Sequence, residues 1–175
     1  KLAAGMLELS NLSWRDRETG MADGSAKLPV PEDFSKWRDM LANDARPVEV
    51  SIDSKVLSLA LLKDWLPAAS RIDPRSTGRL QVKVSGTYAA PMIDVVVEAR
   101  NLRSPEQPKL PPADLTINVT GREGRLSIDG RAVAPDFPAA VMTASMPFRP
   151  AEWAENPDLI KSEPISARVD LPRID

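Results

Sequence analysis

The chain has 175 residues, and its 23 Lys and Arg against 25 Asp and Glu give a net charge of −2. Because there is no excess of basic residues to neutralise phosphates, we expect no nucleic-acid partner. The chain has no cysteine and no histidine. These absences exclude disulfides, thiolate metal sites and cysteine nucleophiles, together with the commonest general base and zinc ligand.

Both ends of the sequence look cut from something longer. It begins with KLAAGMLELS, which has neither an initiator Met nor the charged-then-apolar pattern of a signal peptide, and it stops at ARVDLPRID, which reads as a strand and its exit. We therefore expect targeting and membrane-anchor segments to lie outside residues 1–175.

Most of the chain alternates apolar and polar residues. The pattern predicts a hairpin of residues 7–14 and 20–28 around a turn at 16–20, and it recurs over the ranges 80–85, 92–100, 114–120 and 125–132 and, more weakly, over 139–146. Strict alternation over several residues is typical of an antiparallel sheet with one apolar and one polar face. The connections between these ranges are short enough for hairpins, so we predict a long antiparallel meander.

Three segments break the alternation and predict short helices. The first covers 31–43 and begins with Pro-Glu-Asp, the second covers 56–70 and is ended or kinked by Pro67, and the third covers 150–162, where Pro157 restarts the helix. The fold class is therefore mainly β, an elongated and curled antiparallel sheet with about three short helices.

Two stretches of the sequence resemble each other. Each has a proline, a tryptophan (Trp37 or Trp153), a charged amphipathic stretch, a further proline and an alternating strand that ends in Asp. We place possible repeat units at 14–53 and 126–170. A unit that returns after a long meander predicts a tandem architecture in which each module stacks on the next.

The search for catalytic chemistry favours a non-enzymatic protein. No phosphate-binding glycine loop or nucleophile elbow is present, and no acidic loop has the spacing of a calcium site. Two carboxylates could form an acid/base pair for glycoside hydrolysis, but the candidates fall at outward-facing or turn positions, where a solvated surface is their ordinary role: Asp94, Asp114, Asp129, Asp136 and Asp170. We expect no catalytic residue, no metal and no cofactor.

The apolar face of the predicted sheet is the remaining feature. Its side chains are aliphatic, with few aromatics to fill space. A second sheet would cover such a face in a compact sandwich, whereas in an elongated curled sheet it would stay open as an apolar trough. Both alternatives fit the sequence.

Residues 57–133 resemble the recurring module of the TamB and AsmA-like group of bacterial envelope proteins. A short Leu-rich helix ending in Leu-Pro is matched at 57–67, and a Gly-Arg-Leu strand at 78–80 leads to SGTYAAP at 85–91 and an alternating strand at 93–101. LPPADLTINVTGREGRLSIDGRAV then matches the family's next two strands. The order of these motifs carries the resemblance.

The resemblance implies a fragment of a larger, repetitive β-rich domain in the periplasm of a Gram-negative-type bacterium. The parent protein would be anchored in the inner membrane, and its strands would curl into a taco-shaped trough with an apolar lining. Such proteins are taken to bridge the two membranes and to move phospholipids outward, or to assist outer-membrane protein assembly beside an Omp85-type barrel. No catalytic residues carry over from the family.

We therefore expect a segment of an inter-membrane bridge that shields phospholipid acyl chains from water. Two alternatives stay open: a scaffold for outer-membrane protein assembly with an Omp85-type partner, and a closed β-sandwich binding module. The residues expected to line the lipid groove are Leu80, Val82, Val84, Ile93, Val95, Val97, Leu115, Ile117, Val119, Leu126 and Ile128.

Overall fold

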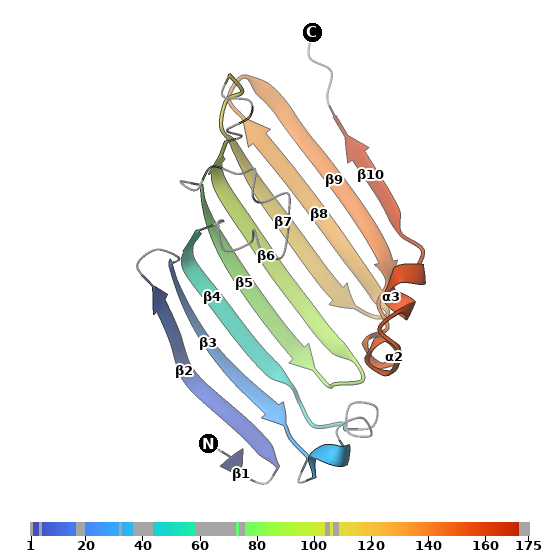
Figure 1. Cartoon of the computed structure of the whole chain (residues 1–175). Coiled ribbons are helices and arrows are strands. Elements are labelled where there is room, and N and C mark those ends of the chain that lie inside the picture. The colour runs from blue at the N-terminus through green and yellow to red at the C-terminus, as the bar shows by residue number, and fades with distance from the viewer. Residues whose placement is uncertain are drawn as a thin grey trace.

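The computed structural model describes residues 2–3, 5–16, 20–31, 33–36, 44–58, 73, 76–103, 106 and 109–171. These residues form one ten-stranded sheet in which the spatial order of the strands follows the sequence (Figure 1). The strands are β1 (Leu2–Ala3), β2 (Met6–Asp16), β3 (Gly20–Pro29), β4 (Glu49–Ser58), β5 (Thr77–Gly86), β6 (Pro91–Leu102), β7 (Ala113–Arg122), β8 (Arg125–Ala134), β9 (Phe137–Pro147) and β10 (Ser166–Asp170).

All neighbouring strands pair antiparallel, so the predicted meander and the mainly β fold class are confirmed. The sheet is open and curled, with β1 and β2 at one edge and β10 at the other (Figure 1). Because the described strands belong to a single sheet, the closed two-sheet sandwich is not the fold of this part of the chain.

The helical predictions have mixed outcomes. A single 3₁₀ turn, η1 (Phe34–Lys36), lies in the predicted 31–43 helix, and α2 (Pro150–Glu155) and α3 (Leu159–Ser162) occupy the predicted 150–162 helix. Pro157 lies between α2 and α3, as expected of a residue that restarts a helix.

The predicted helix over 56–70 is wrong at its start. Residues 56–58 belong to β4, where Leu57 and Ser58 pair with Gly78 and Thr77 of β5. The physical reason is that pairing with β5 outweighs the weak local preference of this Leu-rich segment for a helix. The rest of that prediction lies outside the described residues.

Two hairpin turns use backbone conformations that side chains rarely adopt. Glu123 and Gly124, which join β7 to β8, have φ angles of 52° and 72°. Two successive positive φ angles define the turn whose twist matches that of the paired strands, so this turn fixes the register between β7 and β8. Asp136, with φ of 62°, follows Pro135 in the β8–β9 turn.

A buried serine repairs an irregularity between β4 and β5. The pairing of these strands shifts register between Asp53 and Leu57. Ser54, which is 1% exposed, lies in this gap, and its hydroxyl oxygen accepts a hydrogen bond from the backbone N–H of Leu80 at 2.6 Å. The Ser54 hydroxyl thus gives the part-buried Leu80 amide an acceptor at the point where the pairing of the two strands is interrupted.

The segment before β4 is tied to the rest of the sheet by polar bonds. Arg46 donates to the carbonyl oxygen of Gly5 at 2.9 Å and forms an ion pair with Asp44. The Arg46 guanidinium holds the pKa of the Asp44 carboxyl below its ordinary value. The Tyr88 hydroxyl donates to the Pro29 carbonyl at 2.9 Å, and burial raises the pKa of that hydroxyl.

Little of the described chain is fully buried. Among the described residues, the hydrophobic side chains that are buried as in a core are Val48, Ala99 and Phe148. A sandwich of this length would bury many more aliphatic residues between its layers. The stability of the described part therefore comes largely from the strand ladder and from contacts along one face of the sheet.

Candidate functional site

The predicted lining residues lie on one face of the sheet, which we call the groove face. Directly opposed residues of antiparallel strands project to the same side. Val82 lies opposite Val95, Val95 opposite Val119 and Val119 opposite Ile128. This row crosses four neighbouring strands from β5 to β8 without a polar side chain.

Two parallel rows complete this apolar surface. One joins Leu80, Val97 and Ile117 and ends on Gly130, and the other joins Val84 and Ile93, then Gly121 and Leu126. The remaining predicted residue, Leu115, lies opposite Ala99 and Ala132 on the same face.

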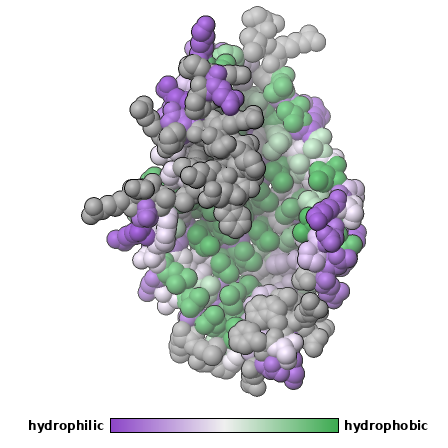
Figure 2. Space-filling model, in the orientation of Figure 1, coloured by the Kyte–Doolittle hydropathy of each residue, from purple (hydrophilic) through white to green (hydrophobic). Residues whose placement is uncertain are grey.

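The predicted lining side chains are all half-buried; none is fully covered and none is fully exposed. Figure 2 shows hydrophobic residues gathered over the middle of the visible face, with hydrophilic residues along its rim. Partial burial is the state expected of side chains that contact their neighbours across a curled sheet while one side stays available to a ligand. Their role as lipid contacts stays a prediction.

The groove face extends beyond the predicted residues at both sides. On the side of the N-terminus, Val50 and Ile52 of β4 lie opposite Val84 and Val82. Next to them the face continues over Ala26 and Gly24 of β3 and over Leu9, Leu12 and Trp14 of β2.

On the side of the C-terminus the groove face continues through Ala144, Met142 and Met146 of β9 to Ala167 and Val169 of β10. In the sequence, the alternation of VEVSID at 48–53 indicates that Val50 and Ile52 share one face of a strand. The alternation in β9 is too weak to place its Met residues on that face.

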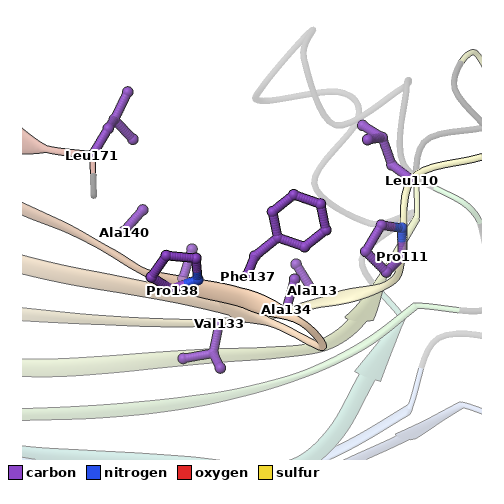
Figure 3. Close-up of a pocket in the computed structure, with 10 residues that line it drawn as sticks. Leu110, Pro111, Ala113, Val133, Ala134, Phe137, Pro138, Ala140 and Leu171 are labelled. Carbon is purple, nitrogen blue, oxygen red and sulfur yellow. The ribbon is translucent and has the colours of Figure 1, made fainter. Parts of the chain in front are cut away.

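Two apolar hollows lie along the groove face. One has a volume of about 380 Å³ and is lined by Leu110, Pro111, Phe137 and Leu171 among others (Figure 3). Phe137 lies opposite Ala134, and Figure 3 shows its ring on the same side of the sheet as Leu171, whereas Val133 points to the other side. The second hollow, of about 430 Å³, lies over β2–β4 and includes Leu12, Trp14 and Ile52.

An aromatic pair lies at the end of the groove face where β9 leads into α2. The Phe148 ring is 7% exposed and lies over Gly121, where an added Cβ would meet ring atoms at 3.1 Å. Trp153 of α2 packs edge-on against Phe148 with ring centroids 5.7 Å apart, and its indole N–H points to Glu163 at 3.4 Å. Trp153 therefore packs within the protein, and Trp37, its counterpart in the predicted repeat, lies outside the described residues.

The opposite face of the sheet is polar. Lys83 of β5 lies opposite Asp94 of β6, and Asp94 forms an ion pair with Arg122 of β7 at 2.6 Å. Arg79 and Asp53 pair at 3.2 Å across β5 and β4. The side-chain hydrogen bond from Arg79 lowers the pKa of the Asp53 carboxyl. This face is the hydrated surface predicted from the polar alternates.

The carboxylates considered as catalytic candidates form hydrogen bonds within the sheet, lie in a turn or are exposed on the polar face. Asp114 accepts a hydrogen bond from the backbone N–H of Asn101 at 2.9 Å, Asp170 accepts from Arg168 at 2.9 Å, and Asp136 occupies a turn. Asp129 is exposed on the polar face. Within the described ranges, no three acidic residues come together as metal ligands.

Comparison with known protein families, with curated proteins and with solved structures found no match to this chain. The resemblance to TamB and AsmA-like proteins therefore stays a prediction that rests on the order of the sequence motifs. None of the helices in the described part of the chain has the length and apolar character needed to cross a bilayer.

Proposed function

We propose that the groove face binds phospholipid acyl chains and shields them from water, as one segment of a periplasmic bridge between the inner and outer membranes. The observation that carries this proposal is the unbroken aliphatic surface from β4 to β9. Its side chains are half-buried, and no second sheet among the described strands faces them.

The energy of the proposed interaction comes from the hydrophobic effect. Each methylene kept out of water contributes about 0.8 kcal/mol, so an acyl chain of about 16 carbons faces a barrier on the order of 12 kcal/mol in an aqueous gap. Valine, leucine and isoleucine rows remove much of that barrier without recognising a head group. The row of Val82, Val95, Val119 and Ile128 contains no polar side chain. This composition suits a non-specific contact with an acyl chain along the whole row.

The polar outer face suits work in an aqueous compartment. Ion pairs such as Asp94–Arg122 lie across neighbouring strands and keep that side of the sheet hydrated. A sheet with one hydrated face and one hydrophobic face resembles an open channel rather than an enclosed enzyme pocket. An Omp85-type barrel at the outer membrane is the partner that the family resemblance implies for the full-length parent.

Site-specific photo-crosslinking in a Gram-negative host expressing the parent protein tests the proposal. A benzoylphenylalanine at Val95 projects into the groove, whereas the same group at the adjacent Val96 projects from the outer face. We expect lipid adducts from position 95 and none from position 96, detected by mass spectrometry after protease digestion. Equal lipid labelling at both positions, or adducts at position 95 only with unfolded outer-membrane protein, would refute acyl-chain shielding.

A further inference from the structure

A hollow lies at the rim of the sheet, where the β5–β6 hairpin, the β7–β8 turn and the start of α2 come together (Figure 1). We call it the rim notch. Its volume is about 620 Å³, which is within the range of small-molecule sites, about 300–1,000 Å³. Residues 89–92 and 148–152 form its two sides, and residues 122–124 lie between them. The Phe148 amide donates to the Gly124 carbonyl at 2.8 Å, which ties the α2 side of the notch to the β7–β8 turn.

The rim notch is continuous with the groove face. Met92 and Arg122 line the notch, and the next residues inward along β6 and β7 are Ile93 and Gly121, which are directly opposed on the groove face. Phe148 belongs to both regions, because it lines the notch and its ring lies over Gly121. A ligand whose hydrophobic part lies on the groove face can therefore place a polar group in the notch.

Charged groups of both signs line the rim notch. Arg122 and Arg149 supply guanidinium groups, and Glu123 and Glu152 supply carboxylates. All four residues are exposed, whereas the remaining side chains of the lining, such as that of Phe148, are apolar. A ligand that carries one phosphate and one ammonium group has the charges that complement this arrangement.

Arg149 is the guanidinium group best placed to hold a phosphate. Its Nη1 donates to Glu152 at 3.3 Å, and its Nε lies 3.9 Å from the Glu163 carboxylate. The Glu163 side chain is only 9% exposed and accepts from the Trp153 indole at 3.4 Å, so it fixes the position of the Arg149 stem. A guanidinium has five N–H donors, and these two contacts leave others for phosphate oxygens.

We propose that the rim notch binds the head group of a zwitterionic phospholipid whose acyl chains lie on the groove face; this inference rests on the acyl-chain binding proposed above. Arg149 donates to the phosphate, and the carboxylates of Glu123 and Glu152 accept from the ammonium group. Arg122 stays paired with Asp94 at 2.6 Å and adds positive charge beside the phosphate. Head-group recognition is thus confined to the rim, and the aliphatic rows contact the acyl chains alone.

Three lipids with the same fluorescent acyl chains test the proposal. Phosphatidylethanolamine carries both charges, phosphatidylglycerol lacks the ammonium group, and diacylglycerol lacks both. We expect the chain to bind phosphatidylethanolamine at least about tenfold more tightly than diacylglycerol, because one hydrogen bond between charged groups accounts for about that factor. Arg149→Gln should weaken the binding of both phospholipids about tenfold and leave diacylglycerol unchanged.

The matched control is Arg100→Gln, which removes the same charge from an exposed arginine of β6 that does not line the notch. We expect it to change the affinity for none of the three lipids. Glu152→Gln removes an acceptor for the ammonium group and a partner of Arg149. It should weaken phosphatidylethanolamine and strengthen phosphatidylglycerol, whereas a loss of folding, visible by circular dichroism, would weaken all three.

Glycerophosphoethanolamine, which has the head group and no acyl chains, tests the notch independently of the groove face. We expect it to shift the Arg149 Nε–Hε signal in NMR spectra at a lower concentration than inorganic phosphate does. An equal response to inorganic phosphate would show a site for any anion and would overturn the proposal.

Equal affinity for the three lipids, or an equal loss in Arg149→Gln and Arg100→Gln, would also overturn the head-group site. If diacylglycerol binds in those cases, the acyl-chain proposal stands without it. A response of Arg149 to glycerophosphoethanolamine with no binding of diacylglycerol would have the opposite meaning, since it would support the notch and count against acyl-chain shielding.

Discussion

Replacing Ile117 by Arg should abolish acyl-chain binding while the sheet stays folded. Ile117 lies in the middle of the groove face, opposite Val97 and Gly130, and is half-buried. An Arg side chain at this position would occupy the space of the ligand and bring a charge that an acyl chain cannot solvate.

The size of the effect follows from the methylenes displaced. A long side chain standing in the groove keeps about four to five methylenes of the ligand from contact, which at about 0.8 kcal/mol each is about 3–4 kcal/mol, or a loss of affinity of about 10²- to 10³-fold. The cost to folding is smaller, about 1–2 kcal/mol, because the half-buried Ile117 loses part of its burial and the Arg head reaches solvent along its stem.

The matched control is Asn118→Arg, which adds the same charge one residue along the same strand. Asn118 is exposed on the outer face and lies opposite Asp129, so an added Arg has a carboxylate beside it. Titration with a fluorescent NBD-labelled phosphatidylethanolamine, with circular dichroism of each variant, separates the outcomes. Unchanged lipid affinity in Ile117→Arg, or an equal loss in Asn118→Arg, would show that the ligand does not lie on this face.

Three further changes test how the sheet is built. Ser54→Ala should lower the free energy of unfolding by about 1–2 kcal/mol, because it leaves the part-buried N–H of Leu80 without this acceptor; an unchanged urea midpoint would contradict this role. Glu123→Asn should raise the melting temperature through a gain of about 0.5–1 kcal/mol, since asparagine tolerates the positive φ at this turn, and a decrease would count against the assignment. Arg79→Gln should let the pKa of Asp53 rise toward its ordinary value of 3.8, as measured by NMR titration of the carboxyl. Because the folded-state pKa is lowered, the stabilisation from this pair is present above the ordinary pKa and is lost as the pH falls through the lowered one, so wild type and variant should converge in stability at acid pH.

The central strands were predictable because one physical signal dominates them. From β5 to β8 each strand has one polar and one aliphatic face, and the connecting turns are short, so alternation alone gives the strands, their antiparallel pairing and the common face of Val82, Val95 and Val119. The same signal fixes the pairing register of the strands, because a slip of one residue would move every aliphatic side chain of a strand to the polar face.

The errors lie where pairing overrides local preference. Nothing in the sequence around 56–58 distinguishes a Leu-rich strand end from the first turn of a helix, and β5 decides the outcome. The bulges at Asn11 and Asn101 were also missed, although asparagine is the side chain that most readily adopts the positive φ of 56° found at both positions. The full exposure of β10 could not be read from its sequence, because β4, which is partly covered, has the same alternating pattern.

The open face follows from the single-layer architecture of the described strands. In a two-layer protein a second sheet buries the aliphatic rows, so no such open face remains. In a single curled sheet the face of Val82, Val95 and Val119 stays uncovered by the other described strands, and its side chains are available to a ligand along the whole row.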